Sequence, residues 1–366
     1  MAFNGRPAAT GSAQPTVLAT IYPGCRRCKK EARSDRDILI GMRYKYGIRG
    51  SGTNANENGM FIRHPQELRM KPTDLHGIFP PIPTPFLDGK VSHDKLADNI
   101  AKWNKTGLKG YVAFGSNGEY VYLSDAEKLE VVKTVVQSAA AGMKVIAGTG
   151  CESTWQTIKL TNACAKLGAH AALVVTPFYY GGRMNDAALL QHFTAVADQA
   201  DIPILIYNVT KFTNINVSVA LVAKLSRHPN IIGIKDSNGN VGSLGEMVGA
   251  VDKDFSVLVG TAGALFGALT LGAVGGVLAL ANVAPEACVR IHHLVRQGDI
   301  EAARRLQIRM LPVNTAVTAT YGVPGLKAAL DMLGYFGGDP RPPLLPASEK
   351  ERAEIQAILK KAELLS

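Results

Sequence analysis

The sequence predicts an α/β fold, a (β/α)8 TIM barrel with additional C-terminal helices, and three observations lead to it. Between residues 77 and 296, eight short apolar segments alternate with eight helical patterns. Strands that are each followed by a helix need crossover connections, so the sheet is expected to be parallel, and eight such units close this kind of barrel. An open doubly wound sheet is the alternative, but no G-x-G-x-x-G motif follows the first strand, which argues against its nucleotide-binding form.

The expected strands are short apolar runs that end at polar or glycine-containing turns. They span residues 77–86, 110–114, 144–147, 171–175, 204–207, 231–234, 256–259 and 274–278. Helical patterns separate them, and one of these opens with a capping box formed by Ser124 and Glu127. The expected helices span residues 94–105, 124–141, 153–167, 186–200, 218–225, 241–251, 262–271 and 285–296, and after the barrel 299–310, 323–333 and 348–364.

The first 69 residues are expected to form a disordered extension. The chain of 366 residues carries a net charge of +10. Residues 1–69 hold 12 basic and 5 acidic side chains, a net of +7, which leaves +3 for the remainder. Residues 50–59 are mostly Gly, Asn, Ser and Thr and cannot bury apolar area. The extension is interpreted either as a mitochondrial transit peptide or as an artefact of the gene model, with translation beginning at Met70.

The predicted domains are therefore the extension at 1–69, the barrel at 70–297 and a C-terminal helical extension at 298–366. Five cysteines are too few and too scattered for a disulfide framework, which indicates a reduced protein. We expect a cytoplasmic location, or the mitochondrial matrix if the extension is a transit peptide. The uncharged residues 257–285 are interrupted by glycines, so they predict strands and short helices and no membrane partner.

The basic extension suggests a second function class, nucleic-acid binding, which would be strongly salt-dependent. Neither a binding fold nor aromatic residues interleaved with the basic ones support it, so we expect no nucleic-acid partner. Cys25 and Cys28 form a lone CxxC motif. A structural zinc site needs four ligands, and because no second CxxC lies nearby we expect no metal.

Residues that carry chemistry in a (β/α)8 barrel follow the carboxyl ends of the strands. Lys235 follows one such strand, and with a period of two residues it shares a face with Ile231 and Gly233. Lys235 is then expected to face the barrel axis, while Ile232 and Ile234 face the helices. Burial disfavours the ammonium and favours the free amine, a nucleophile that forms a Schiff base with a ketone. A lysine that snorkels to the rim or pairs with a carboxylate is the alternative.

Two further strand ends offer polar groups. Tyr207 ends the preceding strand, so we expect it beside Lys235, where its hydroxyl could relay protons. A core tyrosine with a satisfied hydroxyl is the alternative. Ser116 and Asn117 lie in a turn between glycines, where backbone N–H groups can converge on a carboxylate, although many such turns are only turns.

These segments together resemble the pyruvate-dependent class I aldolase superfamily, which includes dihydrodipicolinate synthase and N-acetylneuraminate lyase. The resemblance rests on GSNGE at 115–119, YN at 207–208 and GIKDS at 233–237, and it extends from Leu75 to the C-terminus. Within the superfamily the chain is most similar to the 4-hydroxy-2-oxoglutarate aldolases. The segments that carry this second likeness are GSNGE at 115–119, GCES at 150–153, VVTP at 174–177 with YY at 179–180 and GRM at 182–184, KDS at 235–237 and GAVGGV at 272–277.

The resemblance implies a Schiff-base lyase that works on a small 2-oxo acid without a cofactor. It implies that Lys235 forms the imine and that Tyr207 and Ser116 relay the proton. Tyr180 would complete the relay across a subunit boundary, since similar enzymes are often homotetramers built as dimers of dimers. The substrate-binding residues that it implies are Ser116, Asn117, Ser237, Gly260 and Thr261.

The second substrate stays open between related reactions. Cleavage of 4-hydroxy-2-oxoglutarate to pyruvate and glyoxylate is the main expectation. Condensation of pyruvate with aspartate semialdehyde, the dihydrodipicolinate synthase reaction, is the alternative, as is a related sugar-acid aldolase reaction. Dihydrodipicolinate synthases typically have an arginine five residues after the tyrosine. Here that position is Phe212, which lacks the bidentate donor fork, although Lys211 could partly substitute.

Overall fold

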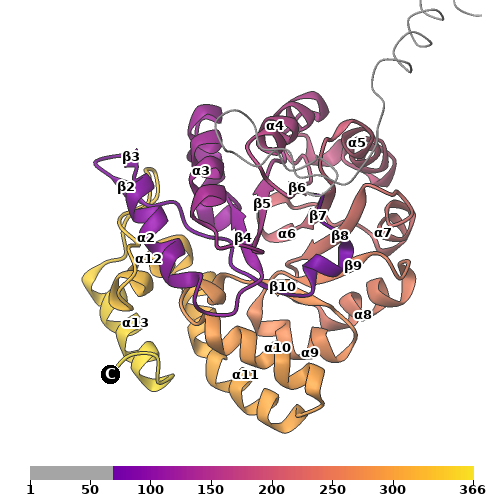
Figure 1. The fold of residues 1–366 in the computed structure, drawn as a ribbon. Coiled ribbons are helices and arrows are strands. Elements are labelled where there is room, and N and C mark those ends of the chain that lie inside the picture. The colour runs from indigo at the N-terminus through magenta and orange to yellow at the C-terminus, as the bar shows by residue number, and fades with distance from the viewer. Residues whose placement is uncertain (1–68) are drawn as a thin grey trace, which may run out of the picture. The chain divides into compact units, whose positions relative to one another are not determined.

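The computed structural model describes residues 69–366, and eight parallel strands lie at their centre (Figure 1). The strands follow the order β1-β10-β9-β8-β7-β6-β5-β4 around the sheet. Their bounds are β1 (Gly77–Phe79), β4 (Gly110–Ala113), β5 (Lys144–Gly148), β6 (Ala171–Val175), β7 (Ile204–Asn208), β8 (Ile231–Asp236), β9 (Ser256–Val259) and β10 (Gly275–Val277). Residues 1–68, and with them the predicted disordered extension and its CxxC motif at Cys25 and Cys28, lie outside the described residues.

The sheet closes between β1 and β4. Pro81, just beyond β1, forms a parallel bridge with Val112 of β4. The N–H of Val112 donates to the carbonyl of Pro80 at 2.9 Å, and the N–H of Ile82 donates to the carbonyl of Val112 at 3.0 Å. The eight strands therefore form the closed parallel barrel that the sequence predicts, without a free sheet edge.

Helices cover the outside of the barrel, and further helices follow it (Figure 1). The helices around the barrel are α2 (His93–Trp103), α3 (Asp125–Ser138), α4 (Thr154–Lys166), α5 (Asp186–Gln199), α6 (Thr210–Thr213), α7 (Val219–Leu225), α8 (Val241–Ala250), α9 (Leu265–Thr270) and α10 (Pro285–Gln297). The C-terminal helices are α11 (Ile300–Thr315), α12 (Gly322–Met332) and α13 (Glu349–Lys361). The sequence did not reveal the hairpin of β2 (Phe86–Leu87) and β3 (Lys90–Val91), because strands of two residues show no alternation.

Local signals explain where several helices begin. In α3 the capping box is present, since the hydroxyl of Ser124 accepts the N–H of Glu127 and the Glu127 carboxylate accepts the N–H of Ser124. Ser153 and Ser218 cap α4 and α7 in the same way, through their hydroxyls. The predicted helix starts at these positions are therefore confirmed to within a residue.

Two hydrophobic clusters surround the strands, one inside the barrel and one between the barrel and its helices. On β7, Leu205 and Tyr207 belong to the inner cluster, while Ile204 and Ile206 belong to the outer one. This alternation is the expected result of a period of two residues in a strand that is buried on both faces.

On β8 a β-bulge interrupts the alternation. Ile204 pairs with Ile231, but Leu205 pairs with Gly233, so Ile232 is an extra residue on this strand. Ile231 therefore lies in the outer cluster and Ile232 in the inner one, opposite to the prediction. Beyond the bulge the predicted alternation resumes, with Ile234 in the outer cluster.

The predicted end of α11 at residue 310 is wrong, because the helix continues through Pro312 to Thr315. A proline within a helix removes the bond to the carbonyl four residues earlier. That carbonyl belongs to Ile308, which lies on the exposed side of α11 where water can bind it. After α11 the chain adds a π-helical segment, Ala316–Thr320.

The apolar run 257–285 forms most of β9, then α9 and β10, and reaches the first residue of α10. Among residues 69–366, no helix combines the length and the apolar character needed to cross a membrane.

Candidate active site

Lys235 lies at the carboxyl end of β8 and is only 2% exposed. Its register partner on β7 is Tyr207, because the two parallel strands end at the same edge of the barrel. The Nζ atom of Lys235 lies 3.8 Å from the centroid of the Tyr207 ring. A buried amine therefore sits directly beside a buried phenol at the end of the barrel where catalysis takes place in this fold.

The hydroxyl of Tyr207 lies 3.3 Å from Oγ of Ser116, which comes from the turn after β4. Burial by itself would raise the pKa of Tyr207, but the neighbouring charge of Lys235 and the hydrogen bond with Ser116 lower it, and the net shift is downward. The phenol is thus more acidic than an ordinary tyrosine and can exchange protons with its neighbours.

Ser116 and Asn117 begin a single turn of 3-10 helix, Ser116–Gly118. The first N–H groups of a helix have no acceptor within it, so those of Ser116 and Asn117 remain available. Two non-glycine residues with positive φ bracket this turn, Phe114 at 36° and Glu119 at 58°. Such backbone is costly and persists only where surrounding contacts hold it.

Ser237 and Gly260 meet at the ends of β8 and β9. The N–H of Gly260 donates to the carbonyl of Asp236 at 2.6 Å, and the N–H of Ser237 donates to that of Asn208 at 2.9 Å. Oγ of Ser237 is buried and forms no hydrogen bond of ordinary length within the described part of the chain, but it interacts with the Tyr207 phenol and helps to lower the pKa of that group. A hydroxyl in that state is ready to bind a polar group of a substrate.

A cavity of about 270 Å³ joins most of the predicted site residues. It is lined by Lys235, Tyr207, Ser116, Asn117, Ser237, Gly260 and Thr261. A second cavity of about 570 Å³ lies next to it and shares Ser116, Lys211 and Phe212 with the first. Together they provide room for a small 2-oxo acid beside Lys235 and for a second molecule farther out.

The C-terminal helices supply one wall of both cavities, which sequence reasoning missed. Thr318 and Ala319 of the π-helical segment line both cavities, as does Val323 of α12. The gap between the predicted helices, from residue 310 to residue 323, indicates irregular backbone in this segment. Nothing in the sequence indicates that the segment lies over the end of the barrel. Nζ of Lys211 donates to the carbonyl of Thr318 at 3.3 Å.

Tyr180 is the predicted site residue that the structure does not bring to these cavities. It is 73% exposed, and its ring packs edge to face against Tyr179 at 5.0 Å. Two backbone N–H groups of the same loop, those of Phe178 and Tyr179, donate to the carboxylate of Glu152 at 3.0 and 2.8 Å. The loop is thus held with Tyr180 directed to the protein surface.

A buried carboxyl group steadies the strand ends that carry Tyr207 and Lys235. Nδ2 of Asn208 donates to Asp236 at 2.6 Å, and the N–H of Asn238 donates to the same carboxyl group at 3.1 Å. Burial raises the pKa of Asp236, against the lowering effect of the bond from Asn208. No group of three or more His, Cys, Asp or Glu side chains that could hold a metal ion occurs between residues 69 and 366.

Comparisons with known proteins agree with this geometry. The model of the dihydrodipicolinate synthetase family matches residues 74–362. A 4-hydroxy-tetrahydrodipicolinate synthase from Methanothrix thermoacetophila is 38% identical over 289 residues, which are 78% of this chain and 97% of the relative. One from Geobacter sulfurreducens is 34% identical and covers 78% of this chain and 97% of its own length.

Solved structures give the same result. The dihydrodipicolinate synthase from Acinetobacter baumannii in complex with pyruvate superposes with a TM-score of 0.76 at 31% identity, covering 80% of this chain and 100% of that one. The enzyme from Aquifex aeolicus superposes with a TM-score of 0.75 at 32% identity, covering 79% and 99%. Because the match spans the barrel and the C-terminal helices, the chain belongs to the dihydrodipicolinate synthetase family of pyruvate-dependent class I aldolases.

Proposed function

We propose that this protein is a lyase in which Lys235 forms a Schiff base with pyruvate or a pyruvyl compound. The observation that supports it most directly is the pairing of buried Lys235 with Tyr207 in one cavity, with Ser116 in contact with the phenol. The synthase from Acinetobacter baumannii, which shares this fold, binds pyruvate in its crystal structure, and this supports the same choice of substrate.

The reaction uses the chain's own groups. The lowered pKa of Tyr207 favours its phenolate form, which takes a proton from the ammonium of Lys235, and the free amine attacks the 2-oxo carbon. Tyr207 then returns that proton to the former carbonyl oxygen, which leaves as water, so that a protonated imine and the Tyr207 phenolate remain. For cleavage, Tyr207 and Ser116 accept the proton of the 4-hydroxyl, and the electron pair of the C3–C4 bond moves into the imine. An aldehyde leaves, the enamine takes up a proton at C3, and water releases pyruvate and the free lysine.

Different residues bind the two ends of the substrate, the pyruvyl carboxylate and the distal carboxylate. The N–H groups of Ser116 and Asn117 hold the pyruvyl carboxylate beside Lys235. Ser237, Gly260 and Thr261 bind toward the distal part of the substrate, and Asn117 contributes its side chain. Tyr180 completes the proton relay only in an assembly, where its exposed ring would reach the cavity of a second copy, as expected for a homotetramer.

Two second substrates are supported by different observations. The curated relatives, at 34% to 38% identity over nearly their full length, favour condensation of pyruvate with aspartate semialdehyde. Phe212 favours cleavage of 4-hydroxy-2-oxoglutarate to pyruvate and glyoxylate, because a phenyl ring at the cavity mouth cannot grip the carboxylate of aspartate semialdehyde. Lys211 lines both cavities and offers a cation to either substrate.

Borohydride reduction in the presence of pyruvate tests the Schiff base. Mass spectrometry should find an irreversible adduct on Lys235 and none on a Lys235→Arg variant. A folded wild-type protein without this adduct would overturn the proposed chemistry. Parallel assays of cleavage and of condensation then identify the second substrate, since condensation without cleavage would remove the argument from Phe212.

A further inference from the structure

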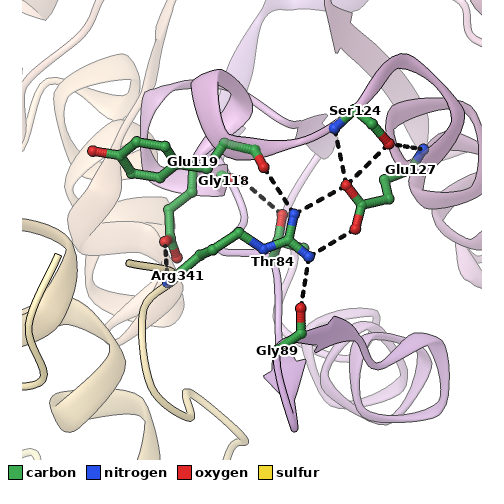
Figure 2. Close-up of polar contacts among 8 residues, drawn as sticks. Thr84, Gly89, Gly118, Glu119, Ser124, Glu127 and Arg341 are labelled. Carbon is green, nitrogen blue, oxygen red and sulfur yellow. Dashed lines mark hydrogen bonds and ion pairs between the residues drawn. The ribbon is translucent and has the colours of Figure 1, made fainter. Parts of the chain in front are cut away.

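The turn that carries Ser116 and Asn117 is tied at its end to the C-terminal part of the chain (Figure 2). Glu119 ends the GSNGE segment and is 2% exposed. Its Oε1 atom lies 2.7 Å from Nζ of Lys327 on α12. Its other oxygen accepts the backbone N–H of Arg341 at 2.8 Å, from a residue 222 positions away. Both partners of this one carboxylate therefore come from beyond the barrel.

Lys327 holds the turn at a second point as well. Besides the Glu119 carboxylate, its ammonium donates to the carbonyl of Thr84 at 2.9 Å and to that of Asp339 at 3.0 Å. The ammonium therefore forms two hydrogen bonds to backbone carbonyls and an ion pair with Oε1 of Glu119. The hydroxyl of Thr84 in turn donates to the carbonyl of Gly118 at 2.7 Å. Two successive residues of the turn are thus fastened, directly or through Thr84, to one buried cation.

The connector that supplies Arg341 is itself fixed to the barrel helices (Figure 2). The Arg341 guanidinium makes a bidentate pair with Glu127 of α3, at 2.7 and 2.9 Å, and also donates to the carbonyl of Gly89 at 2.8 Å. The paired guanidinium holds the pKa of Glu127 at about 2, against the effect of burial. A rigid connector makes the N–H of Arg341 a stationary anchor for Glu119.

The backbone of the turn needs such anchors. Glu119 adopts a left-handed conformation, which side chains other than glycine rarely adopt. A strained residue of this kind stays in place only when its surroundings determine its conformation. Lys327 itself lines neither of the two cavities described above, so its ammonium influences the site indirectly, through the turn that it holds.

We propose that Lys327 and Arg341 are positioning residues for 2-oxo acid binding. They act through Glu119 to hold the N–H groups of Ser116 and Asn117 where they meet the substrate carboxylate. This inference rests on the proposed function, in which those N–H groups bind pyruvate. Lys327 and Arg341 thereby set the affinity for the 2-oxo acid without lining its cavity, while Lys235 and Tyr207 keep their own supports on β7 and β8.

The test measures the pyruvate concentration that gives half-maximal borohydride trapping of Lys235. It compares the wild type with E119Q, K327M and the double variant E119Q/K327M. K327M leaves a buried carboxylate without its cation, so we expect the half-saturating concentration to rise about tenfold or more. E119Q keeps the shape of the side chain and the bond from Arg341 but loses the ion pair with Lys327. The half-saturating pyruvate concentration of E119Q should therefore rise about threefold. The double variant removes both charges and should return to the E119Q value.

K144M is the matched control. Lys144 begins β5 at the opposite end of the barrel and pairs with Asp74 at 3.5 Å, partly exposed. It should leave pyruvate binding unchanged. Thermal denaturation of every variant shows which are folded, and if K327M does not fold, E119Q and the double variant carry the test.

Folded variants that bind pyruvate like the wild type, even with a lower melting temperature, would reduce the ion pair to a structural role and overturn the inference. The inference would also be overturned if the double variant needed as much pyruvate for half-maximal trapping as K327M does. Failure of the wild type to trap pyruvate at Lys235 would instead contradict the proposed function, so the two failures are distinguishable.

Discussion

Gly260→Ala adds one methyl group at the place where β9 meets Ser237. A Cβ atom on Gly260 would lie 2.8 Å from Cβ of Ser237 and 2.9 Å from its Cα, and closer still to Oγ. Carbon atoms attract at about 3.5 Å and repel below it, so one of the two residues must move by about 0.7 Å. The N–H of Gly260 is bound to the carbonyl of Asp236, and that of Ser237 is bound to the carbonyl of Asn208. Both backbones are therefore held, and the Ser237 hydroxyl, which lies nearest to the added methyl group, must be displaced.

A misplacement near 1 Å in an active site lowers the rate by about 100-fold. We therefore expect kcat/KM of Gly260→Ala to fall by about 10- to 100-fold, with a loss of stability of about 1–3 kcal/mol from overpacking. Lys235 should still be trapped by pyruvate and borohydride, because the new methyl group meets Ser237 rather than the lysine. Steady-state kinetics and thermal denaturation measure the two effects.

Gly249→Ala is the control for this substitution. It lies in α8, and an added Cβ there meets no atom within 4 Å. It should keep full activity and gain about 0.5–1 kcal/mol of stability, since alanine is the better helix residue. A Gly260→Ala enzyme with the kcat/KM of the wild type would refute the reasoning, because Ser237 would then tolerate displacement.

Three further predictions concern single side chains. Tyr207→Phe keeps the ring over Lys235 but removes the hydroxyl, so kcat should fall by about 100-fold or more. The borohydride adduct should still form but more slowly, because Tyr207 no longer takes the proton of Lys235. A loss of kcat below tenfold would remove Tyr207 from the relay. Phe212→Arg adds a bidentate donor at the cavity mouth and should lower the KM for aspartate semialdehyde severalfold without lowering the KM for 4-hydroxy-2-oxoglutarate. Equal changes in the two KM values would contradict the argument that residue 212 distinguishes the two substrates. Burial lowers the pKa of His192 to about 4, below its ordinary value of 6.5. Protons therefore bind the unfolded chain more tightly than the folded one. The stability that comes from burying neutral His192 is fully present above pH 6.5 and is lost as the pH falls toward 4. In His192→Gln the melting temperature should depend less on pH across that window, and an unchanged pH dependence would show that another group is responsible.

Much of the barrel could be predicted because its strands carry their own signal. Each of the eight is an apolar run between turns, and the observed bounds of 171–175 and 256–259 match the predicted ones. The neighbouring positions of Tyr207 and Lys235 follow from the same reasoning, because parallel strands that are consecutive in the chain end side by side.

The bulge on β8 lies beyond such reasoning. Ile231 and Ile232 are chemically alike, so no property of either residue indicates which one faces the axis. The choice depends on how β8 pairs with β7 around the closed barrel, and the extra residue appears only in that pairing. The same holds for Lys327, which reads as one polar residue of an amphipathic helix until α12 packs its ammonium against Glu119.

What the sequence by itself determined is the order of strands and helices, the strand ends that hold polar groups, and a lysine and a tyrosine that meet on adjacent strands. Local patterns suffice for these, because side-chain periodicity and turn residues act over a few positions. The tertiary structure decided the face of Ile232, the cavity wall made by the segment after Pro312, and the pairing of Glu119 with Lys327 and Arg341. Each of these joins residues far apart in the chain, and only the closing of the barrel and the docking of the C-terminal helices brings them into contact.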